Sequence, residues 1–268
     1  MSDLIHCITN PISMMMCANA ILSLGARPIM AEHPLEVMEI TETAGALLIN
    51  LGNISDTRME AMKISFSKAL EKEIPVVIDA VGVACSELRR SFILSLISST
   101  PRSDKQILLI KGNYSEIIAL LNPDYKGNGV DAGADVTKDM ATEHAIMLSR
   151  KLDAIVLASG ATDIITDGEK TYLVNNGNPQ LGKITGTGCM LGAICATFFA
   201  GVKDRGGALF ATVRACEHMG IAGELAYEAV SSINAGKVGS GSFYTALFDE
   251  ISLLDDKTIS ERRKVEKL

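Results

Sequence analysis

The sequence predicts an α/β protein with a central, mostly parallel sheet that is covered by helices on both faces. Short apolar runs recur along the chain, and a segment of helical length separates each run from the next. The runs are continuous rather than alternating, which is typical of strands buried on both faces of a parallel sheet. No linker-like stretch divides the 268 residues, so we expect one domain spanning residues 1–268.

Six apolar runs are predicted to form parallel strands. They are bordered by turn-forming residues, and the first ends at Asn10-Pro11, because proline cannot donate to a neighbouring strand. In chain order these strands lie at residues 4–8, 28–30, 46–50, 75–79, 106–110 and 153–158. The second of them is also consistent with an extended turn.

The segments between these strands are expected to be helices. Segment 13–24 is apolar on most faces and ends before Gly25, since glycine suits the position that follows a helix. Segment 34–44 carries glutamates on one exposed side. The remaining helices of this part are expected at residues 55–72, 86–97, 115–121 and 135–151.

The pattern changes in the last third of the chain. Residues 163–166 and 170–174 are predicted to pair as a hairpin at the edge of the sheet, because Asp167-Gly168 is a strong hairpin signal. Three helices are expected to follow, one opened by the glycine-rich turn 185–189 and the others at 207–230 and 243–254. The mixed-charge tail 261–267 is expected to be a solvated helix end.

Composition restricts the classes of function. A net charge of −7, no basic stripe and no tryptophan argue against a nucleic-acid partner. The uncharged stretches 7–26 and 184–202 contain turn residues, so no membrane partner or signal peptide is expected. The six cysteines form no CxxC pair, which favours a cytoplasmic protein with reduced thiols over a metal cluster.

The turn Thr185-Gly186-Thr187-Gly188-Cys189 opens the apolar segment 190–200. Small residues at a helix start leave several backbone N–H groups pointing outward, and the helix dipole adds to their attraction for an anion such as phosphate. Glycine matters here because a side chain would keep the backbone away from the ligand. A simple tight turn is the alternative interpretation.

Polar side chains lie at the carboxyl ends of four predicted strands. They are Asn50 with Gly52-Asn53, Asp79, Lys111-Gly112-Asn113 and Ser159-Gly160. Ligands of open α/β sheets bind beyond these ends, and this set suits Mg²⁺ with a nucleoside triphosphate, whose transfer depends on positioning and charge neutralisation. Glu116, on the next helix, is a second carboxylate, and Mg²⁺ needs only one or two.

Each candidate also has a purely structural interpretation. Asp79 is consistent with a turn cap, Lys111 with a surface lysine, and Glu116 with a carboxylate that answers the helix dipole. The four histidines share no spacing and are expected to be structural or solvated. The common location of the polar residues at one edge of the sheet favours a site.

Several segments carry motifs that together resemble the hydroxyethylthiazole kinase family of the ribokinase-like superfamily. They are residues 6–10, 18–31, 45–52, 79–82, 111–116, 130–131 and 185–189, and the resemblance is nearly full length. The Asn10 and Met30 segments and the cysteine-bearing turn are specific to this family. The strand-end aspartate and the Asn-x-x-Glu pattern are shared with the superfamily.

This resemblance implies a ribokinase-like kinase of thiamine salvage. It implies transfer of the ATP γ-phosphoryl group, with Mg²⁺, to the primary alcohol of 4-methyl-5-(2-hydroxyethyl)thiazole. By position, Asn10, Met30 and Gly186 are expected to contact the thiazole. Family members are trimers with shared sites, so a homotrimer is expected in which Asn10 and Met30 act across a subunit interface.

The resemblance also assigns the remaining site residues. Lys111, Asn113 and Ser159 are expected to bind ATP, and Asp79 and Glu116 the metal. Catalysis is assigned to Cys189 together with the turn residues Gly186, Thr187 and Gly188.

Cys189 stands where superfamily relatives have an aspartate base. A thiol at a helix N-terminus can have a lowered pKa and accept the alcohol proton. A loose transition state asks little of a base, so our hypothesis is that Cys189 assists while the N–H groups do most of the stabilising.

Three positions depart from the family pattern. Ala80 replaces a proline, Lys111 an arginine and Ser240 a proline. None removes a required group, although lysine lacks the bidentate fork of arginine.

Three other functions remain open. A cysteine-nucleophile enzyme needs a base beside Cys189, and only His6 is a candidate. A non-catalytic sensor and a sister kinase acting on hydroxymethylpyrimidine or pyridoxal are the others. Turnover with a panel of alcohols distinguishes them.

Overall fold

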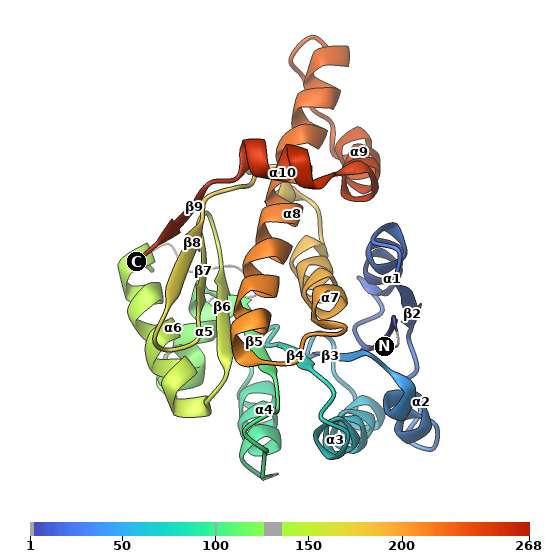
Figure 1. Ribbon diagram of the computed structural model, residues 1–268, viewed down its shortest axis with the longest axis vertical. Coiled ribbons are helices and arrows are strands. Elements are labelled where there is room, and N and C mark those ends of the chain that lie inside the picture. Colours follow the sequence, from blue (N-terminus) through green and yellow to red (C-terminus); the bar gives the residue numbers. More distant parts are fainter. Residues whose placement is uncertain (1–2, 100, 126–135) are drawn as a thin grey trace.

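The computed structural model describes residues 3–99, 101–125 and 136–268, and this part of the chain builds a nine-stranded sheet (Figure 1). The strand order is β2-β1-β3-β4-β5-β6-β7-β8-β9. The bounds are β1 Leu4–Ile8, β2 Arg27–Ile29, β3 Ala46–Asn50, β4 Val76–Asp79, β5 Leu108–Asn113, β6 Ile155–Ser159, β7 Asp163–Thr166, β8 Thr171–Val174 and β9 Val265–Lys267. Strands β1 to β6 are parallel to one another. The pairs β6–β7, β7–β8 and β8–β9 are antiparallel, so the predicted mostly parallel sheet is confirmed.

Helices cover both faces of the sheet, as predicted. One layer consists of α1 Met14–Ser23, α7 Thr187–Phe199, α8 Arg205–Ile233 and α9 Ser240–Leu253. The other consists of α2 Val37–Thr43, α3 Asp56–Glu71, α4 Glu87–Ser99, α5 Tyr114–Leu121 and α6 Lys138–Leu152. A 3-10 turn, η1 Leu181–Lys183, precedes α7, and α10 Asp256–Arg262 precedes β9. None of the described helices is both long and apolar enough to cross a membrane.

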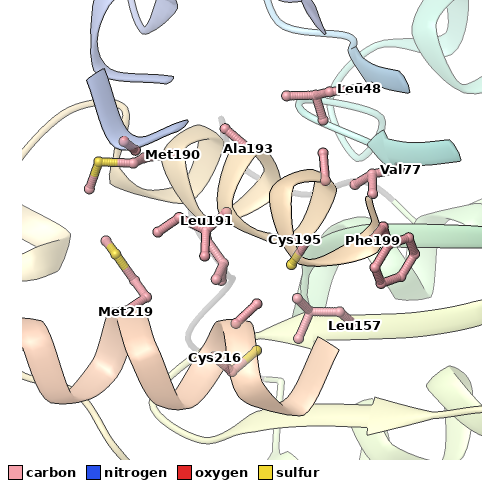
Figure 2. Packing of buried hydrophobic residues seen from close by; sticks show 14 of the residues in the cluster. Leu48, Val77, Leu157, Met190, Leu191, Ala193, Cys195, Phe199, Cys216 and Met219 are labelled. Atoms are coloured by element: carbon pink, nitrogen blue, oxygen red, sulfur yellow. The ribbon is translucent and has the colours of Figure 1, made fainter. Parts of the chain in front are cut away.

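Each buried strand supplies side chains to both layers. Leu47 and Ile49 of β3 face one core and Leu48 the other, which explains the continuous apolar runs of the sequence. Helix α7 packs against β3 and β4 on one side and against α8 on another (Figure 2). Its Phe199 is fully buried in this core. Packing on both sides therefore fixes the direction in which the N-terminus of α7 points.

The strand register places polar residues side by side at the carboxyl edge. Asn50 lies opposite Asp79 in the β3–β4 pair, and Asp79 lies opposite Lys111 in the β4–β5 pair. Asn113 is the register partner of Ser159 in the β5–β6 pair. The strand ends that the sequence selected therefore meet at one edge.

Two predictions about the last strands are wrong. The tail is not a solvated helix end, because α10 stops at Arg262 and residues 265–267 pair with β8. The hairpin is therefore not at the edge of the sheet, and β9 is. The ion pairs that hold the tail against α8 are Arg262–Glu228, Arg263–Glu217 and Lys264–Glu224. The basic residues of the tail are thus paired with acidic residues of a helix that is distant in the sequence.

Other boundaries differ by a few residues. Strand β5 extends to Asn113, so Lys111 and Gly112 lie within the strand rather than after it. Helix α8 is longer at both ends than predicted. The motif Val130-Asp131 and the predicted first residue of helix 135–151 lie outside the described residues.

Candidate active site

A cavity of about 560 Å³ opens at the carboxyl edge of the parallel strands, beside the N-terminus of α7. It is lined by every residue that the sequence assigns to the site except Met30. These residues are Asn10, Asp79, Lys111, Asn113, Glu116, Ser159, Gly186, Thr187, Gly188 and Cys189. The structure therefore brings strand ends and glycine-rich turn together around one space.

A chain of side-chain hydrogen bonds joins four strand ends beneath this cavity. Nδ2 of Asn10 donates to Oδ1 of Asn50 at 3.0 Å, and Nδ2 of Asn50 donates to Oδ2 of Asp79 at 2.8 Å. The other carboxylate oxygen of Asp79 accepts from Nζ of Lys111 at 2.9 Å. All four side chains are buried. Asn50, which the sequence placed at a strand end without a role, orients the Asp79 carboxylate.

Burial and charge set the protonation of the Asp79–Lys111 pair. Burial raises the pKa of the Asp79 carboxyl, whereas Lys111 and Asn50 act to lower it. Burial also acts to lower the pKa of Lys111, but the Asp79 carboxylate outweighs it, so the pKa lies above its ordinary value. Lys111 is therefore a buried cation, not the surface lysine of the alternative interpretation.

Glu116 joins the loops that follow β4 and β5. Its Oε1 accepts from the Gly82 N–H and its Oε2 from the Asn113 N–H, both at 2.7 Å. The Asn113 side chain caps α5 by accepting from the Glu116 N–H at 2.9 Å, which completes a capping box. Burial raises the pKa of the Glu116 carboxyl to about 7, although the Gly82 N–H acts to lower it. Glu116 therefore does more than interact with the helix dipole, because it also connects the two loops through these hydrogen bonds.

Asp79 and Glu116 fit a magnesium ion. Each carboxylate oxygen keeps a lone pair beyond its single hydrogen bond, and both side chains line the cavity. No group of three or more potential metal-ligating His, Cys, Asp or Glu side chains occurs in the described ranges. Mg²⁺ takes most of its ligands from phosphate and water, so one or two carboxylates suffice in number.

The glycine-rich turn begins α7 in the predicted manner. Gly186 is the N-cap residue with φ +93°, and a Cβ there would lie 2.9 Å from Sδ of Met16. Within the described chain, no hydrogen-bond acceptor is found for the N–H groups of Thr187, Gly188 and Cys189. These N–H groups form a ready anion site at the positive end of the helix.

The turn also faces the charged pair. A Cβ at Gly188 would lie 4.0 Å from Nζ of Lys111, and one at Gly192 would lie 3.3 Å from Oδ2 of Asp79. The Oγ1 of Thr187 lies 2.9 Å from the carbonyl oxygen of Leu181 and 3.1 Å from that of Ile184, so its single hydroxyl proton is used within the turn and this residue offers the cavity its N–H rather than its side chain. The anion site and the buried ion pair therefore share the cavity.

Cys189 lies three residues into α7, where its Sγ is 3.4 Å from Nδ2 of Asn10. The expected lowering of its pKa is wrong for this structure. Burial raises the pKa of the thiol, Asp79 adds to the rise, and Lys111 only partly opposes it. The helix N-terminus alone does not make Cys189 a thiolate.

Met30 lies outside the cavity, half-buried just after β2. The next residue is held by His6, whose Nε2 is 2.9 Å from the carbonyl oxygen of Ala31. His6 is fully buried, and its Nδ1 contacts Oγ1 of Thr41 at 2.9 Å, so it is structural, as expected. Within one chain, Met30 does not share the space lined by Asn10.

Two cations of the cavity were not predicted. Arg89 of α4 and Lys183 of η1 both line it. Lys183 has a sequence signal, a cation two residues before the glycine-rich turn. Arg89 has none, because its position depends on how the loop after β4 folds.

A sequence model described as the hydroxyethylthiazole kinase family matches residues 1–257. The chain belongs to this family. A hydroxyethylthiazole kinase 2 of Clostridium botulinum is 42% identical over 267 residues, covering 98% of this chain and 94% of the relative. The solved structure of a hydroxyethylthiazole kinase protein from Pyrococcus horikoshii has a TM-score of 0.83 and 31% identity, covering 99% of this chain and 93% of that one.

Membership of the hydroxyethylthiazole kinase family makes the protein a kinase, and its fold is ribokinase-like. A ribokinase-like superfamily protein from Enterococcus faecalis has a TM-score of 0.62 at 13% identity, covering 94% of this chain and 88% of that one. At this identity the likeness concerns the fold alone. It shows that the mostly parallel sheet with its two helical layers is also the fold of this neighbour.

Proposed function

We propose that the protein phosphorylates the primary alcohol of 4-methyl-5-(2-hydroxyethyl)thiazole, with ATP as co-substrate, in thiamine salvage. One observation carries the proposal. The unpaired N–H groups at the start of α7 open onto the same cavity as the buried Asp79–Lys111 pair. Phosphoryl transfer requires a site that binds phosphate oxygens next to charged groups that position and neutralise the nucleotide.

In this mechanism the chain mainly positions groups and balances charge. The N–H groups of Thr187, Gly188 and Cys189 stabilise the negative charge of the transferred phosphoryl group. Lys111, Asn113 and Ser159 bind ATP from the ends of β5 and β6. Cys189 lies at the alcohol, where its thiolate form, a minor species because burial raises the pKa of the thiol, accepts the alcohol proton as the bond from the alcohol oxygen to phosphorus forms and the bond to ADP breaks. Asn10 and Gly186 border the thiazole.

Asp79 and Glu116 would hold Mg²⁺. The ion would neutralise charge on the ATP phosphates when bound. Asn50 and Lys111 orient Asp79, and the N–H groups of Gly82 and Asn113 orient Glu116. We expect Glu116→Gln to raise the Mg²⁺ concentration needed for half-maximal rate, because an amide is a weaker ligand than a carboxylate.

We further propose a homotrimer in which Met30 contributes to a neighbouring subunit's site. Met30 lies outside its own cavity, and two apolar residues of the segment that follows Asn10, Ile12 and Met15, are 68% and 67% exposed. If Met30 acts across an interface, mixed oligomers of Met30→Asp and Asp79→Asn subunits regain activity that neither variant has alone. Mixing two batches of Asp79→Asn subunits is the control, and no recovery in the mixed oligomers would contradict the proposal.

We also propose one domain in the cytoplasm. Strands drawn from residues 4 to 267 join one sheet, which supports a single domain. All six cysteines are free thiols, which fits a reducing compartment.

The test is ADP release with a panel of alcohols: hydroxyethylthiazole, hydroxymethylpyrimidine, pyridoxal and ribose. We expect release with the thiazole alone. Preference for another alcohol would assign the protein to a sister activity, and binding without ADP release would indicate a sensor. Pocket discrimination among small alcohols amounts to only a few kcal/mol, so all four alcohols must be compared at equal concentration.

A further inference from the structure

The cavity contains more positive charge than the buried ion pair accounts for. Its ionisable side chains, apart from the thiol, are Asp79, Glu116, Lys111, Arg89 and Lys183. Asp79 and Lys111 neutralise each other at 2.9 Å, and both oxygens of Glu116 accept from backbone N–H groups. Arg89 and Lys183 remain as cations that the site itself does not neutralise.

Arg89 is held in place by the loop after β4. Its Nη1 donates to the carbonyl of Val81 at 3.2 Å, and its guanidinium lies against Cα of Gly82, where a Cβ would overlap it. Over the described ranges, no carboxylate lies within 4.0 Å of this guanidinium, and no acceptor is found for its other N–H groups. A half-buried guanidinium with free N–H groups is preorganised for a planar oxyanion.

Lys183 lines the cavity from η1, the 3-10 turn that precedes the glycine-rich turn. It is the last residue of η1, three positions before the N-cap Gly186. Its ammonium group is exposed and has no acidic partner in the part of the chain that the structure describes. It is therefore a solvent-exposed positive charge near the N-terminus of α7, unpaired among the described residues.

We propose that Arg89 and Lys183 bind phosphate oxygens of the nucleoside triphosphate, with Arg89 as a fixed clamp and Lys183 as a closing charge. The inference rests on the proposed function, since it concerns the co-substrate of that same site. With these two cations the cavity carries a net positive charge before Mg²⁺ is counted, which suits a polyanion. If each cation binds a different phosphate, a triphosphate gains from both of them and a monophosphate from at most one.

The experiment compares substitutions of the two cavity cations with substitutions of an arginine and a lysine that lie outside the cavity. The test variants are Arg89→Gln, Arg89→Lys and Lys183→Gln. Arg90→Gln is the matched control on α4, because Arg90 donates to the carbonyl of Tyr125 and does not line the cavity. Lys170→Gln, on the exposed β7–β8 turn, is the control for Lys183. Binding of ATP and AMP is measured by titration calorimetry, and kcat and KM for ATP by ADP release.

We expect Arg89→Gln to weaken ATP binding about 10- to 100-fold, the usual effect of losing a hydrogen bond to a charged group. AMP binding should be unchanged. Arg89→Lys should recover only part of the loss, because lysine lacks the fork. Lys183→Gln should raise KM for ATP by a smaller factor and reduce its dependence on salt. Both controls should match the wild-type protein.

Two outcomes would overturn this inference. ATP affinity that is unchanged in all three test variants would mean that neither cation contacts the phosphates. Equal loss of ATP and AMP binding would mean that Arg89 acts only through the Val81–Gly82 loop. Failure of the proposed function looks different, because the wild-type protein itself would then release no ADP with the thiazole. If Arg89→Gln does not fold, Lys183→Gln and Arg89→Lys still decide.

Discussion

Asp79 and Lys111 form a buried ion pair between adjacent strands, with 2.9 Å between Oδ1 and Nζ. They are register partners in the β4–β5 pair, and their residues are 0% and 3% exposed. Because both charges are removed from water, each depends on the other for compensation. The pair therefore links the stability of the fold to the chemistry of the site.

Lys111→Met should destabilise the protein by about 3–5 kcal/mol, because it leaves the Asp79 carboxylate buried without its cation. The free energy of unfolding, measured with urea, checks this. The double variant Asp79→Asn with Lys111→Met should recover most of the loss and remain inactive. A loss below about 1 kcal/mol in the single variant would contradict a tightly paired buried charge.

Gly82→Ala should be more harmful than Gly25→Ala, although both glycines have φ +79°. Alanine at Gly25 meets nothing within 4 Å, so it should lose only the left-handed backbone term of about 1–2 kcal/mol. Alanine at Gly82 would overlap the Arg89 guanidinium. It would also displace the backbone N–H of residue 82, from which Glu116 accepts a hydrogen bond.

Urea unfolding and kcat/KM for both variants test this comparison. Gly25→Ala should retain wild-type kcat/KM, and Gly82→Ala should lose at least about tenfold. Equal stability and equal activity of the two variants would show that the Arg89 contact at Gly82 is unimportant.

Much of the fold follows from local signals in the sequence. Continuous apolar runs specify strands that are buried on both faces, and the register then places the residue after each run at the same edge. That is why Asp79 and Lys111 could be assigned together before any contact was known. The amides of the 185–189 turn could also be assigned, since a helix start exposes N–H groups wherever the helix packs.

The features that were missed depend on distant partners. Strand β9 has only three residues and mixed charge, and the basic residues just before it pair with Glu217, Glu224 and Glu228 of α8. The position of Arg89 depends on a loop carbonyl, and the pKa of Cys189 depends on burial. None of these is encoded within a short window of sequence.

Cys189→Ala should reduce kcat by about tenfold rather than abolish turnover, because the N–H groups of the α7 start remain and a loose transition state needs little help from a base. Cys189→Asp should retain at least the activity of the alanine variant, since a carboxylate can also accept the proton. Steady-state ADP release measures both. Complete loss in both variants would instead indicate a covalent role for the thiol.

Asp163→Asn should change how stability depends on pH. Oδ1 of Asp163 accepts from the Gly160 N–H at 3.1 Å, and burial raises the pKa of this carboxyl from 3.8 to about 6. Between these values the unfolded chain has released a proton that the folded chain still holds, so the stability of the wild-type protein falls as pH rises through this window. The asparagine variant keeps the acceptor for Gly160 and lacks this slope.

The free energy of unfolding of both proteins, measured from pH 4 to pH 7, tests the sign. Relative to wild type, Asp163→Asn should gain up to about 3 kcal/mol across this range, most of it between pH 4 and 6. Asp255→Asn is the control of opposite sign, because the Thr258 N–H lowers the pKa of the Asp255 carboxyl. Its variant should lose stability relative to wild type as pH rises through the acid range. A difference between Asp163→Asn and wild type that is constant across pH would mean that folding does not shift the pKa of this carboxyl.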